Sequence, residues 1–191
     1  MASADTTIEW TDRTWNPTTG CDRVSPGCKF CYAETVAKRF TNHFPQGFKF
    51  TERRERLDQP KRWRKPSRIF VDSMSDLFHE QMDFEYLKEI FAVMAECPQH
   101  VFQILTKREK RLAELALKLE WPSNVWMGVS VEMQLYTRRI DVLRDTPAHV
   151  RFLSCEPLLG PLTLDLNDIH WVITGGESGL HHRPIIDSGM G

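Results

Sequence analysis

Short apolar runs alternate with segments of helical periodicity along most of the chain. Within the runs, apolar residues follow one another almost without interruption, whereas a strand with one face in water would alternate apolar and polar residues. Uninterrupted runs are typical of parallel β-strands that are covered on both faces. They predict five strands, at residues 68–72, 100–105, 125–131, 150–154 and 170–174.

Between these strands, apolar residues recur every three or four positions, which indicates amphipathic helices. Asp83 can cap the first helix, and Pro98 ends it. The apolar faces consist of Phe84, Leu87, Ile90, Phe91 and Met94 in the first helix, Leu112, Leu115, Ala116 and Leu119 in the second, and residues from Leu135 to Leu143, before Pro147, in the third. This alternation predicts an α/β fold, and the pattern alone leaves open a barrel and an open doubly wound sheet.

The first 67 residues are less regular. A first strand is expected at either Ile8–Trp10 or Thr14–Asn16, and a helix from Cys31 to Phe40. Prolines and a glycine interrupt any helical pattern in residues 41–67. We therefore expect one domain over residues 1–191, with an irregular basic insertion at about 41–67.

The six predicted strands are too few for a complete eight-stranded barrel, which typically needs about 250 residues. The last strand leads directly into Gly175–Gly179, and no helical pattern follows it. The sequence therefore predicts a (β/α)6 barrel-like fold, which is either a partial barrel or a barrel cut short at its C-terminal end.

Composition narrows the class of protein. Hydrophobic residues form 41% of the chain and charged residues 27%, which indicates a folded chain rather than a disordered one. The net charge of −1 gives no overall attraction to nucleic acid. The N-terminal segment lacks a signal-peptide pattern, and no apolar run could span a bilayer. We therefore expect a cytoplasmic protein with no membrane partner and with reduced cysteines.

The strongest chemical signal is a group of three cysteines, Cys21, Cys28 and Cys31, in a C-x6-C-x2-C pattern. Three thiolates from one loop can converge on one metal centre, and soft sulfur ligands select iron–sulfur clusters or zinc. In a [4Fe–4S] cluster, three cysteines leave one iron open to a substrate or cofactor. The alternatives are structural zinc with His43 or His79 as fourth ligand, and cysteines that bind nothing. The remaining cysteines, Cys97 and Cys155, are interpreted as small buried residues.

Polar residues follow each predicted strand, where the active sites of parallel barrels lie. They are Asp72, Ser73, Asp76, Thr106, Lys107, Ser130, Glu132, Ser154, Glu156 and Glu177. Each could instead cap the helix that follows it. Gly175 and Gly176 would allow a ligand to approach the backbone closely.

Residues 53–68 contain eight basic residues and two acidic ones, together with Trp63. Such a segment could bind a phosphate backbone and stack a base. The candidate nucleic-acid-binding residues are Arg62, Trp63, Arg64 and Lys65. The alternative is an ordinary solvated surface.

Two stretches of the chain, Trp15–Cys21 and Ser25–Glu34, resemble the phage-associated three-Cys-motif family, which belongs with the radical-SAM-like proteins. Further matching stretches are Arg62–Pro66, Asp72–Phe78, Leu105–Arg108, Gly128–Val131, Ser154–Leu158 and Gly175–Gly179. Family members usually continue for tens of residues beyond the last of these. The first cysteine gap also differs from the superfamily's commonest C-x3-C-x2-C spacing.

The resemblance implies a [4Fe–4S] cluster on Cys21, Cys28 and Cys31, with S-adenosylmethionine on the open iron. An electron donor would reduce the cluster, and cleavage of S-adenosylmethionine would release a 5′-deoxyadenosyl radical that takes hydrogen from a substrate. Phe30 occupies the position where such enzymes often place an aromatic ring beside the adenine. The other candidate cofactor-binding residues are Asp72, Ser73, Ser130, Glu132, Ser154 and Glu156.

Two functional hypotheses follow. The first is a radical-SAM-type enzyme that acts on an unidentified substrate, with a nucleotide or nucleic acid as one candidate. The second is a non-catalytic module, stabilised by zinc or a cluster, that binds nucleic acid through the basic segment.

Overall fold

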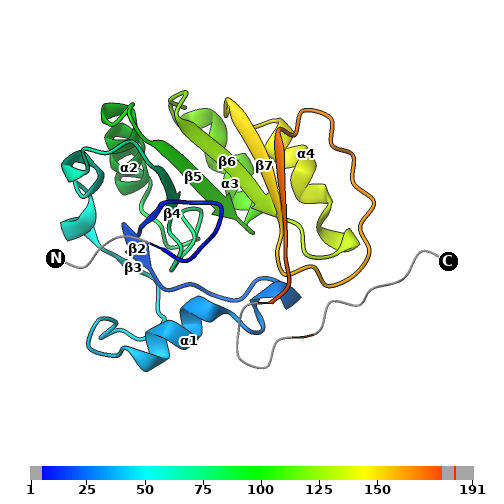
Figure 1. Cartoon of the computed structure of the whole chain (residues 1–191), viewed down its shortest axis with the longest axis horizontal. Coiled ribbons are helices and arrows are strands. Elements are labelled where there is room, and N and C mark those ends of the chain that lie inside the picture. Colours follow the sequence, from blue (N-terminus) through cyan, green and yellow to red (C-terminus); the bar gives the residue numbers. More distant parts are fainter. Residues whose placement is uncertain (1–5, 178–182, 184–191) are drawn as a thin grey trace.

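A six-stranded parallel sheet forms the centre of the molecule in the computed structural model, which describes residues 6–177 and 183. The strands lie in the order β1, β4, β5, β6, β7, β8 (Figure 1). Their bounds are Arg13–Trp15, Arg68–Val71, Val101–Thr106, Val125–Ser130, Val150–Cys155 and Trp171–Thr174. All five strands expected after residue 67 are confirmed within one or two residues.

The strand order follows the chain order without a reversal. A doubly wound sheet reverses its order at a switch point, so the structure excludes that alternative. The fold is mixed α/β, with a six-stranded parallel sheet that is consistent with a partial barrel. Within the described residues, β1 and β8 form the two edges of the sheet, and no pairing joins them.

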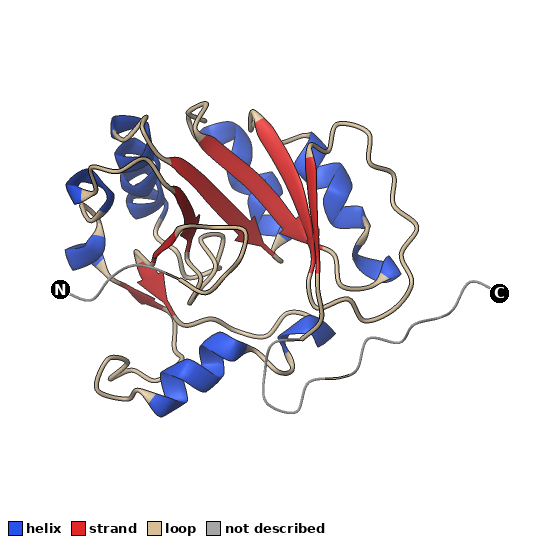
Figure 2. Cartoon of the chain, in the orientation of Figure 1, coloured by secondary structure: helices blue, strands red, loops and turns tan. Residues whose placement is uncertain are grey.

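Helices cover one face of the sheet (Figure 2). They are α2 (Phe84–Glu96), α3 (Glu109–Leu115) with the 3₁₀ turn η4 (Ala116–Lys118), and α4 (Arg138–Arg144) preceded by η5 (Gln134–Tyr136). The side chain of Asp83 accepts a hydrogen bond from Tyr86 N at 2.9 Å, so the predicted cap of α2 is confirmed. Ile69, Ile104 and Met127 are fully buried in the core beneath these helices.

Aromatic rings line the opposite face, on the alternate positions of the strands. The Trp10 ring lies 4.7 Å from that of Phe70 on β4 and 6.1 Å from that of Trp171 on β8. Residues 8–10 therefore pack across this face, and the strand expected at Ile8–Trp10 or Thr14–Asn16 is the second of these, β1. Phe152 on β7 fills the space above Gly128 on β6.

The expected helix near the cysteines is α1 (Tyr32–Arg39), preceded by the 3₁₀ turn η1 (Pro26–Cys28). Residues 41–67 are irregular, as predicted, but they contain β3 (Thr51–Glu52), η2 (Arg54–Arg56) and η3 (Pro60–Arg62). Strand β3 pairs with β2 (Thr18–Thr19) in an antiparallel ladder. This ladder joins the segment to the chain just before the cysteines.

The connection between β7 and β8, residues 156–170, contains no helix or strand. Its apolar residues Leu158, Leu162, Leu164 and Ile169 pack against the core instead. The expectation that no helix follows β8 concerns residues that lie outside the described part of the chain. In that described part, no helix is both long and apolar enough to cross a membrane.

Candidate functional site

The loop that carries the three cysteines, residues 20–31, starts from a glycine that the backbone requires. Gly20 has a φ of +85°, and a Cβ there would collide with the carbonyl group of Lys49. Gly20 N donates to Met74 O at 2.8 Å, and Ser75 Oγ donates to Gly20 O at 2.7 Å. These contacts fix the beginning of the cysteine loop against the segment that follows β4.

The cysteine loop lies across the carboxyl ends of the central strands (Figure 1). At its first cysteine it contacts Arg108, which follows β5, and at Gly27 it lies against Glu132, which follows β6. Just beyond it, the Tyr32 hydroxyl donates to Ser73 O, after β4. The structure therefore places the cysteine loop at this edge of the sheet.

Cys21, Cys28 and Cys31 are free thiols of intermediate exposure. Burial and the nearby Asp76 carboxylate raise the pKa of Cys21 to about 12, although Arg108 acts in the opposite direction. Among residues 6–177 and 183, no group of three or more histidine, cysteine, aspartate or glutamate side chains is arranged to hold a metal ion. The meeting of the three sulfur atoms at one point thus stays a prediction.

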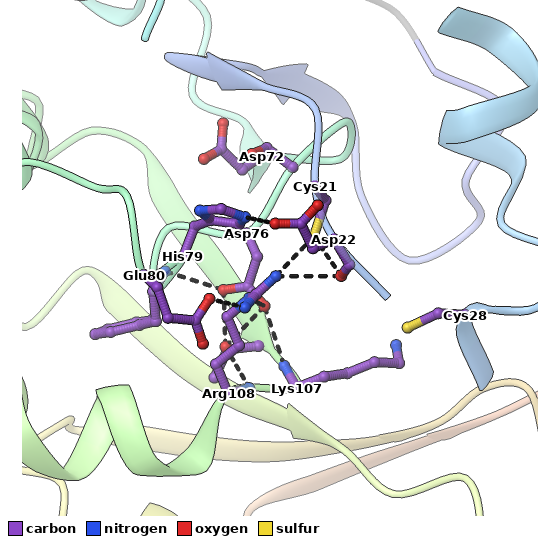
Figure 3. A network of polar contacts seen from close by, with 12 residues as sticks. Cys21, Asp22, Cys28, Asp72, Asp76, His79, Glu80, Lys107 and Arg108 are labelled. Atoms are coloured by element: carbon purple, nitrogen blue, oxygen red, sulfur yellow. Dashed lines mark hydrogen bonds and ion pairs between the residues drawn. The ribbon is translucent and has the colours of Figure 1, made fainter. Parts of the chain in front are cut away.

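A polar network lies between the cysteine loop and the strand ends (Figure 3). At its base, the carboxylate of Asp76, which is 6% exposed, accepts from Thr106 Oγ1 at 2.8 and 2.9 Å. It also accepts from Phe78 N at 2.9 Å and from Lys107 N at 3.2 Å. Asp76 therefore ties the segment after β4 to the end of β5, because its hydrogen bonds reach both.

Arg108 connects this base to the cysteine loop. Its Nη2 donates to Cys21 Sγ at 3.4 Å and to Asp22 O at 3.1 Å, and its Nη1 pairs with Glu80. The sequence analysis named Lys107 as a candidate site residue because it follows a predicted strand. It did not identify Arg108, Glu80 or Asp22 as part of the site. The only signal for Arg108 was its position just after a strand.

His79 lies beside the first cysteine but has both ring nitrogens engaged. Gln81 N donates to Nδ1 at 3.1 Å, which leaves Nε2 to donate to the Asp22 carboxylate at 3.2 Å. Burial lowers the pKa of His79. His79 could therefore bind zinc only by giving up one of these two hydrogen bonds. His43 is exposed and packs edge-on to Phe40.

Lys107, Ser130, Ser154 and Glu156 form a second polar group at the ends of β5, β6 and β7. Lys107 Nζ donates to Ser130 Oγ at 2.9 Å, and its side chain extends toward Cys28 (Figure 3). Ser154 Oγ donates to Glu156 at 3.3 Å. Burial raises the pKa of Glu156. The structure therefore brings these four predicted residues to the same edge of the sheet as the cysteines.

Glu132 is fully buried directly under the cysteine loop. Its Oε2 accepts from Arg139 at 2.8 Å, whereas its Oε1 has no hydrogen-bond partner within the described residues. A Cβ at Gly27 would lie 3.2 Å from this carboxylate. Glu132 therefore packs against the cysteine loop, as expected of a residue that lines the site.

Phe30 has two cations near its ring, with Lys29 Nζ 5.1 Å and the Arg183 guanidinium 5.5 Å from the ring centroid. Arg183 also donates to Pro26 O at 3.0 Å and pairs with Glu177. Glu177 thus holds Arg183, and through it the cysteine loop. Sequence reasoning missed Arg183, which follows the last strand without any strand-end signal.

Three of the residues expected at the strand ends, Asp72, Ser73 and Gly175, make close contacts with other parts of the protein. The Asp72 carboxyl group, 3% exposed, accepts from Thr18 N at 3.0 Å and Thr18 Oγ1 at 2.5 Å, so it holds β2 inside the fold and does not face an open site. Its neighbour Ser73 donates to Asn16 Oδ1 at 3.1 Å. At Gly175 a Cβ would collide with Glu156, so this glycine makes room for a side chain of the protein.

The candidate nucleic-acid-binding residues lie at the opposite edge of the sheet. His100, just before β5, hydrogen-bonds to Trp63 O at 3.0 Å, and Arg13 covers the Trp63 ring at 5.3 Å. The six residues of β5 separate this amino edge from the carboxyl edge by roughly 20 Å. Arg62, Arg64 and Lys65 are exposed there, so the basic segment and the cysteines face different ends of the molecule.

Other basic residues of residues 53–68 form ion pairs, both within the segment and with acidic residues outside it. Arg54 pairs with Glu52 at 2.9 Å, and Lys61 pairs with Asp58 at 2.9 Å and with Glu96 at 2.7 Å. The local excess of positive charge in the sequence is therefore reduced by folding. The exposed triplet Arg62, Arg64 and Lys65 forms no such ion pair within the described residues, and binding of nucleic acid there stays a prediction.

Comparison with known proteins gives a fold and a family. No curated protein matches the chain. A solved structure of a cysteine-to-serine mutant of spore photoproduct lyase matches with a TM-score of 0.57 and 13% identity, over 82% of this chain and 49% of that one. The chain thus spans about half of that protein, and at this identity the likeness concerns the fold alone. A family model matches residues 5–189, so the chain belongs to the family described as protein of unknown function DUF5131.

Proposed function

We propose that the chain binds a [4Fe–4S] cluster through Cys21, Cys28 and Cys31, and with S-adenosylmethionine acts as a radical-SAM-type enzyme. One observation carries this proposal. The cysteine loop lies across the carboxyl ends of β4, β5 and β6, where parallel α/β folds place their active sites. The similarity of the fold to that of spore photoproduct lyase supports the proposal.

The residues present suit an iron–sulfur cluster. Three thiols on one loop form a soft donor set, and none of them is in a disulfide. Two cations reach toward the loop, because Arg108 donates to Cys21 and Lys107 extends toward Cys28. Arg108 opposes the burial and the Asp76 carboxylate, which together raise the pKa of the Cys21 thiol. The three thiols therefore fit the group by the kind of ligand that they offer.

The side chains at this edge would then have separate roles. Cys21, Cys28 and Cys31 would hold three irons, and the open iron with S-adenosylmethionine would supply a one-electron cleavage that yields a hydrogen-abstracting radical. Lys107 offers a positive charge to a carboxylate, and Ser130, Ser154 and Glu156 offer hydrogen-bonding groups beside it. The aromatic face under these residues, with Trp10, would exclude water from that edge.

Anaerobic reconstitution with iron and sulfide tests the proposal. We expect about four irons per chain, charge-transfer absorption in the visible range, and reductive release of 5′-deoxyadenosine from S-adenosylmethionine with a chemical one-electron donor. Replacing Cys21, Cys28 or Cys31 by alanine should abolish both iron binding and cleavage. Cys97→Ala provides the matched control, because Cys97 is 1% exposed at the end of α2, away from the cysteine loop.

The non-catalytic module is the competing function, supported by the exposed triplet of Arg62, Arg64 and Lys65 at the far edge. Bound zinc without cluster absorption, together with salt-dependent binding of oligonucleotides, would establish that function and overturn the enzyme proposal.

A further inference from the structure

We infer that Arg108 is a positioning residue that holds the Cys21 end of the cysteine loop to the strand ends and raises the reduction potential of a cluster bound there. This inference rests on the proposed function and deepens it. Its observation is that one buried guanidinium contacts both the sulfur of Cys21 and the backbone of Asp22.

The guanidinium group reaches across the site from a fixed base. Arg108 N donates to Thr106 Oγ1 at 3.0 Å, and Thr106 in turn donates to Asp76. The side chain is 3% exposed, so its direction is set by packing. Nη2 then makes the two contacts with the cysteine loop, at 3.4 Å to sulfur and 3.1 Å to the carbonyl oxygen.

Neutralising the nearby carboxylates does not explain this burial. The Asp76 carboxylate already accepts hydrogen bonds from Thr106 and two backbone groups, and it lies 3.8 Å from Arg108 Nε, which has no hydrogen-bond partner within the described residues. The Glu80 side chain is 63% exposed and could be solvated without any arginine. The contacts that the buried guanidinium adds are those of Nη2 with Cys21 and Asp22.

The charge of Arg108 has a predictable electrical effect. An arginine keeps its positive charge at every pH relevant to proteins. A cluster gains one negative charge when it is reduced, and hydrogen bonds to its sulfur ligands together with nearby charge set its potential. A fixed N–H donor on Cys21 Sγ, carrying a full positive charge, stabilises the more negative state. Removing it should therefore make the cluster harder to reduce.

The experiment compares Arg108→Met and Arg108→Lys with a matched control, Arg111→Met. Arg111 lies in α3, three residues after Arg108, and pairs with Glu114 of the same helix at 2.9 Å. Two measurements are made on each protein. Hydrogen exchange of the metal-free protein reports how firmly residues 20–25 are held, and a spectroscopic redox titration of the reconstituted protein reports the cluster's midpoint potential.

We expect Arg108→Met to speed exchange in residues 20–25 by about tenfold, with exchange in α2 unchanged. We also expect the ratio of reduced to oxidised cluster at a given potential to fall about tenfold, which corresponds to a midpoint about 59 mV lower for one electron. Arg108→Lys keeps the positive charge but replaces the planar guanidinium by one ammonium group, so it should lower the midpoint potential less than Arg108→Met does. Arg111→Met should change neither quantity.

Failure of the proposed function and failure of this inference give different results. If the wild-type protein binds no cluster, the proposed function and the redox role fall together, whereas hydrogen exchange still decides whether Arg108 holds the loop. If the cluster forms and Arg108→Met changes both quantities by less than twofold, the inference is wrong and the proposed function stands. If Arg108→Met does not fold, Arg108→Lys decides, because unchanged exchange and potential in that variant would also overturn the inference.

Discussion

Gly128 and Phe152 offer a quantitative test of the sheet that carries the candidate site. Gly128 on β6 is directly paired with Phe152 on β7, and a Cβ added at Gly128 would lie 2.5 Å from two atoms of the phenyl ring. Carbon atoms in contact normally lie about 3.5–4.0 Å apart, so the ring would have to move by about 1 Å or more. Phe152 is fully buried, and its ring packs 5.5 Å from that of Trp171. The ring therefore has no free space into which it can move.

We expect Gly128→Ala to lower the free energy of unfolding by about 2 kcal/mol, within the range of about 1–3 kcal/mol for overpacked cores. For a chain of 191 residues this corresponds to a melting temperature lower by roughly 4–8 °C. Urea unfolding followed by circular dichroism measures the free energy directly. Adding Phe152→Leu should make the double variant more stable than the sum of the two single changes by about 1 kcal/mol, because the smaller side chain relieves the collision.

The same pair lies directly beneath the site. Ser130 and Ser154 come two residues after Gly128 and Phe152, so they point to the same face one step nearer the carboxyl edge. If Gly128→Ala leaves the free energy of unfolding unchanged within about 0.5 kcal/mol, or if the double variant shows no coupling, then the pairing of β6 with β7 in this register is wrong. The placement of Ser130 beside Ser154 would be wrong with it.

Three further predictions concern a buried carboxyl group, a backbone turn and the basic segment. Burial raises the pKa of Asp72 from 3.8 to about 8, so between about pH 4 and pH 8 the folded chain keeps a proton that the unfolded chain releases. The free energy of unfolding should therefore fall as the pH rises, by up to about 1.4 kcal/mol per pH unit. Urea unfolding at pH 5 and pH 8 should show a smaller difference for Asp72→Asn than for the wild type. Gly20→Ala should cost more than about 2 kcal/mol in the same assay, because its φ of +85° and the Lys49 carbonyl both oppose a Cβ, and a neutral result would show that the beginning of the cysteine loop is misplaced. If the basic segment binds nucleic acid, replacing Arg62, Arg64 and Lys65 together by glutamine should weaken oligonucleotide binding and reduce its salt dependence, as measured by fluorescence anisotropy, and an unchanged affinity would exclude that role.

The regular part of the fold could be predicted because its signals are local. Apolar runs marked β4 to β8, and Asp83 with the periodic apolar residues after it marked α2. The β2–β3 ladder could not be predicted, since it pairs two residues with two others more than thirty positions away, and so short a segment has no period. The first strand was left between two segments because Trp10 is as apolar as a strand residue, yet it packs on the rings of Phe70 and Trp171.

The site was predicted by residue type and position but not by contact. The strand-end rule placed Lys107, Ser130, Ser154 and Glu156 correctly at one edge. It also selected Asp72, whose buried carboxyl group accepts hydrogen bonds from Thr18. No sequence pattern shows that the side chain of Arg108 contacts a cysteine 87 positions earlier. Such contacts depend on how loops fold back over the sheet, which local periodicity does not determine.

The separation of the two candidate surfaces decides how the functional hypotheses relate to each other. Cys21 contacts the carboxyl end of β5 through Arg108, whereas Trp63 contacts its amino end through His100, with roughly 20 Å of strand between them. A substrate of the cysteine site would have to present its reacting atom at the carboxyl edge, so a nucleotide shorter than this separation and held only by Arg62, Arg64 and Lys65 would be out of reach. Loss of the basic triplet should therefore leave cleavage of S-adenosylmethionine unchanged, and loss of Cys21 should leave oligonucleotide affinity unchanged. If either change affects both activities, one ligand spans the whole sheet, and the two surfaces act as a single site.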